Sequence, residues 1–379
     1  MYYRSMCGCE VSALGFGAMR LPVIDGQEGQ PDEQAVFEMV DYAIEKGVNY
    51  FDTAWGYHDG KSEIIMGKAL ARHPRDSFYV ATKFPGYDNG NFGKHEEIFA
   101  KQLEKMGVDY VDFYLMHNVC ESNIENYLAD DRFGTISYFL GQKEAGKITH
   151  LGFSCHGNVE TLGRFLEAYG DKMEFCQLQL NYMDWDFQDA RRKVAMLAER
   201  NIPVIVMEPL RGGGLISFTE DEQAKLESLR PGASAVDWAF RFVQGVEEVA
   251  VVLSGMSNFD QLKENIDIFA DAQPLTVEQQ EALFEIARAK IAKTALPCTK
   301  CRYCTTHCPM ELDIPWLIEL FNEHQSREGF AFIAPMAISA LDDDKKPSAC
   351  IGCGACESVC PQNLPIPDTF AKFSEQLGL

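Results

Sequence analysis

The sequence has no long hydrophobic run and little positive charge. Its 379 residues include 57 Asp and Glu against 34 Lys and Arg, for a net charge of −23. Such a chain repels a phosphate backbone, which excludes nucleic acid as a partner. No apolar run approaches the ~20 residues that cross a bilayer, and the opening MYYRSMCGCE lacks the basic and apolar regions of a signal peptide. We therefore expect a cytoplasmic protein with no membrane partner.

Short apolar runs alternate with segments of helical period between residues 11 and 256. A composition of 46% hydrophobic and 24% charged residues is typical of globular proteins, and the length favours two domains. Nearly unbroken apolar runs indicate strands buried on both faces, and eight of them with intervening helices predict an α/β fold, a (β/α)₈ TIM barrel. The runs are VSALGFGAM, VNYFDTA, FYVATKF, VDFYLMHN, ITHLGFSC, EFCQLQLN, PVIVMEPL and EVAVVLSGM.

Helix signals mark the outer ring and the domain boundary. Residues 32–47 and 95–107 each end in glycine, as helix C-termini commonly do. Thr276 and Gln279 have the spacing of a capping box, which predicts a helix to about Ala292. We expect a barrel over residues 1–275, a connecting helix over 276–294 and a second domain over 295–379.

Eight of the 13 cysteines form two tandem arrays with the pattern CxxCxxCxxxCP. Three thiolates spaced two residues apart can hold one [4Fe-4S] cluster, while the fourth cysteine reaches the other cluster. Structural zinc is the alternative, but zinc sites take two separated pairs of ligands, so we favour two [4Fe-4S] clusters. The spacing groups the first three cysteines of each array with the last of the other: Cys298, Cys301, Cys304 with Cys360, and Cys350, Cys353, Cys356 with Cys308.

The second domain contains an internal repeat. Residues 308–323 match residues 360–375 at Cys, Pro, Leu, Ile, Pro, Phe and Glu, and each copy predicts a cysteine loop followed by an amphipathic helix. Residues 295–375 resemble bacterial two-cluster ferredoxins, which implies a mainly helical ferredoxin-like domain. Outside the arrays, we expect small buried apolar residues at Cys7, Cys9, Cys120 and Cys176. Cys155 is the exception, because it lies at the end of a predicted strand.

Four polar residues lie at one end of the predicted barrel. Asp52, Lys83 and His117 end strands, and Tyr57 follows in the loop after the second strand. Singly, Asp52 with Lys83 is compatible with a buried ion pair, and His117 with a core histidine. Together they suit a reduction, because a carbonyl that receives hydride also needs a proton on its oxygen. Lys83 would lower the pKa of Tyr57, Asp52 would hold the ammonium, and His117 would polarise the substrate oxygen.

These four residues, with VSALGFGAMRLP, GFSCH and SGMSNFDQLKEN, resemble the aldo-keto reductase family over residues 1–270. The resemblance implies that Ser154 and Gln177 bind the nicotinamide carboxamide and that Gln261 and Asn265 bind the adenine end. The other cofactor contacts it implies are Gly17, Met19, Cys155, Met207, Leu210, Arg211, Gly213, Ser254, Gly255 and Ser257.

The sequence departs from the family pattern in three places, the last of which spans two residues. Met207 replaces the aromatic residue that stacks on nicotinamide, and Cys155 replaces an asparagine. Met256 and Ser257 replace the basic residues that hold a 2′-phosphate, which leaves Arg211 as the candidate charge partner. The sequence therefore favours NADH over NADPH, or a flavin.

The two halves together suggest an oxidoreductase. A nicotinamide transfers two electrons at once and a cluster transfers one, and a flavin can bridge the two. We expect reduction of a small carbonyl-type substrate, with clusters relaying electrons from ferredoxin or another electron-transfer protein. The alternatives are a conventional NAD(P)H reductase with structural or redox-sensing clusters, and a non-catalytic nicotinamide sensor.

Overall fold

The computed structural model describes residues 1–27, 29–298, 301–327, 331 and 333–379, and it divides into two compact units. The first contains Met1–Pro209 and Ala233–Val277, and the second contains Leu210–Gly232 and Glu278–Leu379. The segment 210–232, which the sequence placed within the barrel domain, thus groups with the C-terminal residues.

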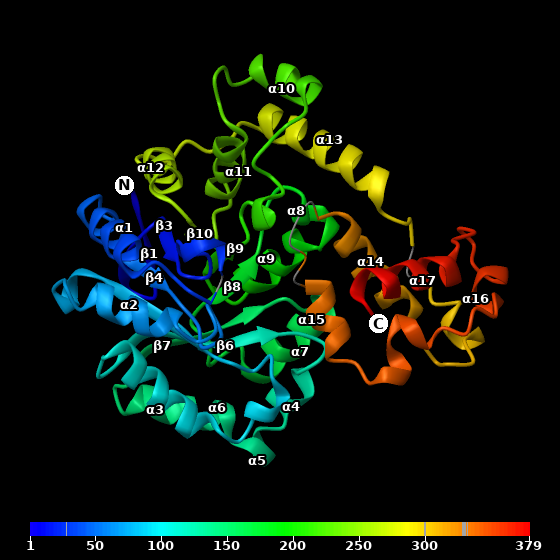
Figure 1. Ribbon diagram of the computed structural model, residues 1–379, viewed down its shortest axis with the longest axis horizontal. Coiled ribbons are helices and arrows are strands. Elements are labelled where there is room, and N and C mark those ends of the chain that lie inside the picture. Colours follow the sequence, from blue (N-terminus) through cyan, green and yellow to red (C-terminus); the bar gives the residue numbers. More distant parts are fainter. Residues whose placement is uncertain (28, 299–300, 328–330, 332) are drawn as a thin grey trace. The chain divides into compact units, whose positions relative to one another are not determined.

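The first unit is a closed barrel of eight parallel strands, which confirms the predicted fold (Figure 1). All eight predicted runs contain a strand, and the strand order around the barrel follows the chain. The strands are β3 (Leu14–Gly17), β4 (Tyr50–Asp52), β5 (Tyr79–Phe84), β6 (Val111–Val119), β7 (Ile148–Cys155), β8 (Cys176–Gln179), β9 (Val204–Met207) and β10 (Val249–Gly255).

Helices connect consecutive strands. Asp32 caps the first of them by accepting a hydrogen bond from the Ala35 amide, and Gly107 ends another in the left-handed conformation with φ 65°. The helices of the first unit are α1 (Glu33–Glu45), α2 (Ser62–Leu70), α3 (His95–Met106), α4 (Ile124–Leu128), α5 (Asp130–Phe133), α6 (Thr135–Glu144), α7 (Val159–Tyr169), α8 (Asp184–Phe187), α9 (Ala190–Ala198), α11 (Ala235–Gln244) and α12 (Phe259–Ile268).

An antiparallel hairpin that the sequence did not predict precedes the barrel. It consists of β1 (Tyr3–Met6) and β2 (Cys9–Ser12), which are joined by a turn at Cys7 and Gly8. Both turn residues have positive φ, 54° and 82°, as tight hairpin turns require. Met6 and Val11 belong to the same apolar cluster as inward-facing residues of the barrel strands, so the hairpin covers one end of the barrel core.

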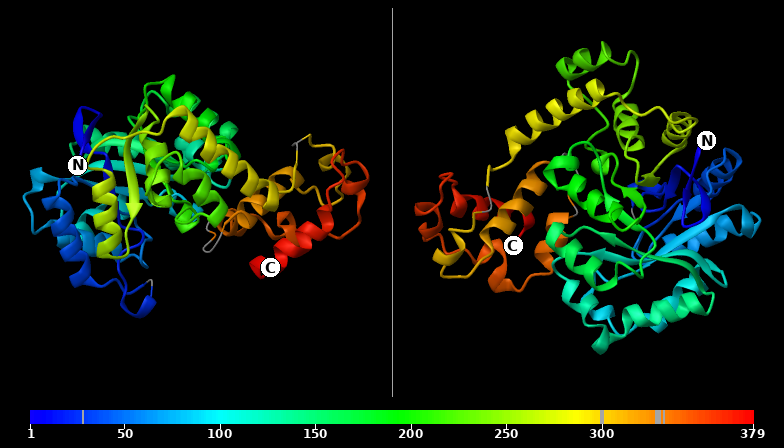
Figure 2. Two further views of the ribbon diagram at one scale, coloured as in Figure 1. Left: turned by 90° about the horizontal axis from the view of Figure 1, so that it is seen from above. Right: turned by 180° about the vertical axis from the view of Figure 1, so that it is seen from behind.

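The second unit is helical and has its own apolar core. The two helices that follow the cysteine arrays, α14 (Ile314–Gln325) and α17 (Ile366–Leu377), lie side by side in the views of Figures 1 and 2 and are in contact. Both have 12 residues and begin six residues after the last cysteine of an array, as the internal repeat predicts. Phe321 and Phe373, equivalent positions of the repeat, pack edge to face at 5.6 Å. The helices are α10 (Glu220–Glu227), α13 (Val277–Thr294), α14 (Ile314–Gln325), α15 (Ile333–Ser339), α16 (Ala355–Ser358) and α17 (Ile366–Leu377).

Side-chain contacts with α13 explain why the segment 210–232 belongs to the second unit. Gln279 donates a hydrogen bond to the Leu229 carbonyl at 2.9 Å, and Lys225 on α10 forms an ion pair with Glu285. Within the described part of the chain, no helix combines the length and the apolar character needed to cross a membrane.

Candidate active site and cluster ligands

The four polar residues that the sequence singled out lie at the C-terminal ends of adjacent strands. Asp52 ends β4, Lys83 is the penultimate residue of β5, His117 lies near the end of β6, and Tyr57 follows β4 in the loop before α2. Lys83 Nζ lies 2.6 Å from Asp52 Oδ1 and 3.3 Å from the Tyr57 hydroxyl. Lys83 also donates to the Thr53 carbonyl at 2.8 Å, so three oxygens surround one ammonium.

Burial controls the protonation states of this group. It lowers the pKa of Lys83, but Asp52 and Tyr57 outweigh it, so the pKa lies above its usual value and Lys83 stays charged. Burial has the opposite effect on Tyr57: it raises the pKa of the phenol, and the nearby Lys83 only partly offsets the rise. The charge of Lys83 lowers the pKa of Tyr57 as the sequence predicts, but burial has the larger effect, so the net shift is upward. Tyr57 therefore keeps its proton at neutral pH and is available as an acid.

His117 stays neutral, because burial and then the charge of Lys83 lower its pKa well below the usual value. Its ring lies 6.2 Å from the Tyr57 ring, edge to face. Its Nδ1 is buried without a hydrogen-bond partner among the described residues. A neutral imidazole can donate one hydrogen bond, which suits polarisation of a substrate oxygen.

Tyr87 is a residue of this site that the sequence gave no reason to choose. It follows β5, and its ring packs edge to face against His117 at 5.4 Å. Burial raises its pKa to about 12. A Cβ at Gly56 would lie 2.5 Å from the Tyr87 hydroxyl, so the glycine before Tyr57 makes room for this second phenol. Only three-dimensional proximity identifies Tyr87.

Two candidate nicotinamide contacts are neighbours across β7 and β8. Ser154 and Gln177 are paired in the strand register. Ser154 Oγ accepts a hydrogen bond from the Asn118 amide, and Gln177 Nε2 lies 3.7 Å from Met207 Sδ. Gln177 Oε1 is a buried acceptor with no hydrogen-bond partner in the described part of the chain. A carboxamide NH₂ would satisfy this acceptor, so these residues fit a nicotinamide.

The candidate adenine-end residues form two hydrogen-bonded pairs. Asn265 Nδ2 donates to Ser254 Oγ at 3.0 Å, and the Ser257 amide donates to Gln261 Oε1 at 2.7 Å. The remaining candidates of the first unit differ in exposure: Gly17 and Gly255 are paired in β3 and β10, Met19 is 41% exposed, and Cys155 is fully buried. A Cβ at Gly17 would lie 3.1 Å from the Ser254 carbonyl oxygen, which explains the small residue there.

Three candidate cofactor contacts belong to the second unit: Leu210, Arg211 and Gly213. Arg211, the sequence's candidate partner for a 2′-phosphate, is 3% exposed. Its guanidinium donates to the Ser326 carbonyl at 2.8 Å and to Ser326 Oγ at 2.7 Å. Arg211 thus fixes the end of α14 within the second unit, and this use competes with binding a phosphate.

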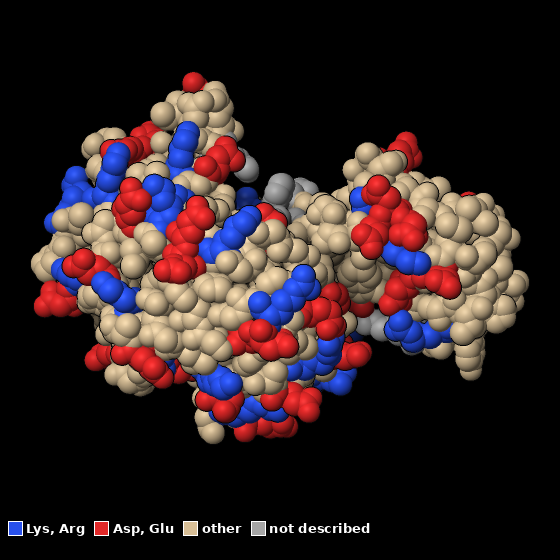
Figure 3. All heavy atoms as spheres, turned by 90° about the horizontal axis from the view of Figure 1, so that it is seen from below, with Lys and Arg blue, Asp and Glu red and all other residues tan. Residues whose placement is uncertain are grey.

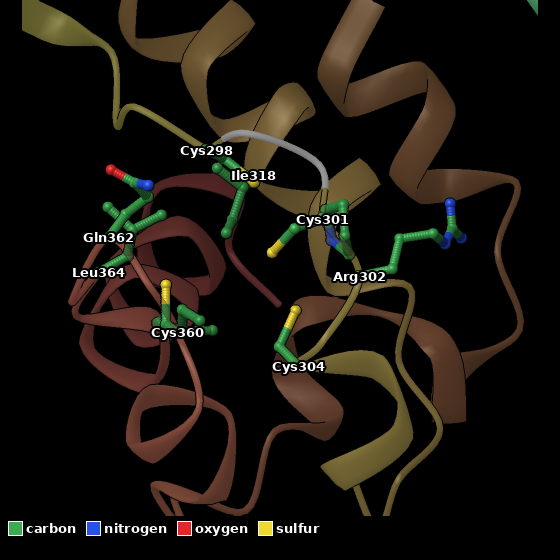
Figure 4. Close-up of a pocket in the computed structure, with 10 residues that line it drawn as sticks. Cys298, Cys301, Arg302, Cys304, Ile318, Cys360, Gln362 and Leu364 are labelled. Atoms are coloured by element: carbon green, nitrogen blue, oxygen red, sulfur yellow. The ribbon is translucent and has the colours of Figure 1, made fainter.

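The eight array cysteines surround two cavities. Each has a volume of about 320 Å³, which includes the solvent-filled space at its opening. One is lined by Cys298, Cys301, Cys304 and Cys360, and Figure 4 shows the sulfurs of Cys301, Cys304 and Cys360 directed into one space. The other is lined by Cys350, Cys353, Cys356 and Cys308. The structure therefore brings together the two crossed sets that the spacing groups.

Equivalent cysteines of the two arrays have the same burial. Cys301 and Cys353 are exposed, Cys304 and Cys356 are buried, and the other four are intermediate. Burial raises the pKa of Cys304 to about 11 and that of Cys356 to about 11. Each cavity has four thiols and is otherwise lined mainly by apolar side chains. A bound metal centre would replace the protons of these thiols, so the residues fit a cluster in each cavity.

Fold and site together define a (β/α)₈ oxidoreductase barrel joined to a cysteine-rich helical unit. The model of the aldo/keto reductase family matches residues 13–288, and the model of the 4Fe-4S dicluster domain matches residues 297–364. The chain belongs to the aldo/keto reductase family and carries a C-terminal 4Fe-4S dicluster domain, which confirms both resemblances.

Several known proteins are similar to the barrel. The protein named uncharacterized oxidoreductase YqkF, from Bacillus subtilis (strain 168), is 25% identical over 315 residues, 75% of this chain and 95% of that protein. L-galactose dehydrogenase of Arabidopsis thaliana is 26% identical over 304 residues, 74% and 90%. The holo form of aldo-keto reductase AKR11C1 from Bacillus halodurans superposes with a TM-score of 0.62 at 26% identity, over 76% of this chain and 97% of that one. The chain is thus an oxidoreductase.

Proposed function

We propose that the barrel reduces a carbonyl or related small substrate, with Tyr57 as the proton donor to the substrate oxygen. The observation that carries the proposal is the position of Lys83 Nζ, 3.3 Å from the Tyr57 hydroxyl and 2.6 Å from Asp52. A buried phenol beside an ammonium can release its proton to a developing alkoxide, because the charge of Lys83 stabilises the tyrosinate that remains.

Each residue has a distinct role in this proposal. Asp52 holds Lys83 in place and balances its charge, and His117 donates a hydrogen bond to the substrate oxygen. A bound nicotinamide would supply the hydride, held at its carboxamide by Ser154 and Gln177. We propose NADH over NADPH, because Arg211 is engaged by Ser326 and Met256 and Ser257 carry no charge.

Replacement of Tyr57 by Phe tests the proton donor. We expect Tyr57→Phe to lower kcat/KM for carbonyl reduction by about 10²–10⁴-fold, the usual contribution of a positioned acid. Tyr87→Phe is the matched control, since it removes a second phenol next to His117 and should change the rate much less. Parallel assays with NADH and NADPH test the nicotinamide preference.

Equal losses in the two variants would contradict the assignment of Tyr57. Nicotinamide binding, measured by fluorescence titration, should survive Tyr57→Phe. If the wild-type protein binds nicotinamide but turns over none of a broad set of aldehydes and ketones, the nicotinamide-sensor alternative gains support.

We further propose that two [4Fe-4S] clusters bind in the two cysteine-lined cavities and relay electrons to the barrel substrate, as a second source of electrons that can replace the nicotinamide hydride. Bound clusters would supply one-electron transfer, so a flavin is the proposed intermediate carrier between single electrons and a two-electron reduction. Ferredoxin or another electron-transfer protein is the proposed donor. On the face shown in Figure 3, acidic and basic side chains are interspersed.

Cluster reoxidation tests the relay. Oxygen-free protein is reduced, freed of reductant and mixed with a carbonyl substrate, and the visible absorption of the clusters is followed. Recovery of the oxidised spectrum upon addition of substrate is expected, and denaturation should release a flavin. If reduced clusters persist with substrate while NADH supports turnover, the relay fails.

A second candidate function is that of a conventional NAD(P)H reductase with structural or redox-sensing clusters. The observation that favours it is the position of Cys304 and Cys356 within the apolar core of the second unit, where a cluster would help to hold the fold. This candidate predicts nicotinamide-dependent turnover that is independent of the redox state of the clusters.

A further inference from the structure

Four potential metal ligands meet at the end of the barrel opposite the tetrad of Asp52, Tyr57, Lys83 and His117. Cys7 lies in the hairpin turn and Cys9 begins β2, while His150 is the third residue of β7 and Glu174 lies two residues before β8. Because parallel strands share one direction, the starts of β7 and β8 lie at the other end from Asp52, Lys83 and His117. None of these four residues belongs to the cysteine arrays or to the proposed active site.

The donor atoms are close together. Cys7 Sγ, a ring nitrogen of His150 and a carboxylate oxygen of Glu174 all lie within 4.8 Å of one another. Cys9 Sγ lies 3.5 Å from His150 Nε2, and Cys7 Sγ lies 3.4 Å from the Glu174 carbonyl oxygen. All four residues are half-buried, so the group is reachable from solvent and yet enclosed.

Glu174 orients the imidazole. Its Oε2 lies 2.8 Å from His150 Nδ1, while Lys143 and the Leu151 amide bind its other oxygen. A carboxylate that accepts the Nδ1 proton leaves the Nε2 lone pair directed away, toward Cys9. Proteins use this carboxylate–histidine arrangement to present the imidazole to a metal. Phe113 stacks on the same ring at 5.0 Å and limits its rotation.

The type of donor selects the type of ion. Two sulfurs and one imidazole nitrogen suit a soft or borderline ion such as Zn²⁺ and disfavour Mg²⁺ and Ca²⁺, which need oxygen ligands. Two of the ligands come from the hairpin and the third from a barrel strand, so an ion bound here would link the two elements.

We propose that Cys7, Cys9 and His150 bind one Zn²⁺ ion, with Glu174 as the partner that positions the imidazole. The ion fastens the β1–β2 hairpin across the end of the barrel. Its role is structural, because the tetrad lies at the opposite end of the strands.

Metal analysis of the full-length, oxygen-free protein with its clusters in place tests this site. The protein is incubated with Zn²⁺, freed of excess metal, and analysed for zinc and iron by mass spectrometry. The wild-type chain should retain about one zinc, and X-ray absorption at the zinc edge should show sulfur at about 2.3 Å and nitrogen at about 2.0–2.1 Å. Cys9→Ser and His150→Gln should retain about none, with iron content unchanged.

Cys120→Ser is the matched control, since Cys120 is a buried cysteine of the same unit and its sulfur contacts Ser122. It should bind zinc as the wild type does. Glu174→Gln provides a second measurement should a ligand variant fail to fold. It can still accept a hydrogen bond from His150, and chelator competition should show affinity reduced by about 10–100-fold.

Equal zinc content in the wild type and in every variant would overturn the proposal, because the ion would then lie elsewhere. So would a wild-type protein that retains no zinc while its clusters are intact. A disulfide between Cys7 and Cys9 in the protein isolated without oxygen, detected by alkylation and mass spectrometry, would also overturn it. These outcomes leave the tetrad and the clusters untouched.

Discussion

Replacement of Lys83 by Met is expected to destabilise the barrel by about 3–5 kcal/mol, the usual result when one partner of a buried ion pair is removed. Lys83 is fully buried and Asp52 is 3% exposed. Without the ammonium, Asp52 Oδ1 loses its hydrogen-bond donor. Chemical denaturation of the wild type and the variant, followed by circular dichroism, measures the change in the free energy of unfolding.

An exposed pair gives the matched control. Lys68 and Glu33 form an ion pair at 2.8 Å, with side chains 53% and 47% exposed. Lys68→Met should therefore change stability by less than about 1 kcal/mol. The double variant Asp52→Asn with Lys83→Met should recover part of the stability, because it removes the uncompensated carboxylate. A Lys83→Met protein as stable as Lys68→Met would contradict the buried-pair argument.

The same substitution should reduce activity by a different route. Lys83 lowers the pKa of Tyr57 against the opposing effect of burial, so its removal raises that pKa further. An acid works only while it is protonated, hence activity that depends on Tyr57 falls as pH rises through this pKa. In Lys83→Met the alkaline limb of the rate profile should move to higher pH, while kcat/KM falls by about 10²–10⁴-fold. A merely destabilised protein would lose activity without that shift.

Much of this fold could be predicted because its signals are local. Strands buried on both faces require unbroken apolar runs, and each of the eight runs contains a barrel strand. Barrel topology then brings the ends of adjacent strands together, which is why the sequence alone groups Asp52, Lys83 and His117. The crossed grouping of the cysteines likewise follows from spacing alone.

The remaining features depend on contacts between distant segments. The strands of the hairpin β1–β2, YRSM and CEVS, lack the unbroken apolar run that identifies the barrel strands. Nothing in the composition of residues 210–232 indicates that they pack against α13. The group around His150 combines residues up to 167 positions apart, as Cys7 and Glu174 are. The pKa of Tyr57 rises because the side chain is buried, and the charged residues near it in the sequence do not reveal that burial.

Replacement of Cys360 by Ala is expected to remove the cluster associated with the first array, although Cys360 belongs to the second. Cys360 lines the cavity of Cys298, Cys301 and Cys304 (Figure 4). Iron should fall from about eight to about four atoms per chain, since each cubane holds four. Iron analysis and the visible spectrum of oxygen-free protein measure the loss.

Two double variants separate the crossed arrangement from one in which each array holds its own cluster. In the crossed arrangement, Cys304→Ala with Cys360→Ala affects a single cavity, so about four irons should remain. Cys356→Ala with Cys360→Ala affects both cavities and should leave about none. Independent arrays would give the reverse result, because Cys356 and Cys360 would then share one cluster. The comparison is balanced, since Cys304 and Cys356 are both buried and are the third cysteine of their respective arrays.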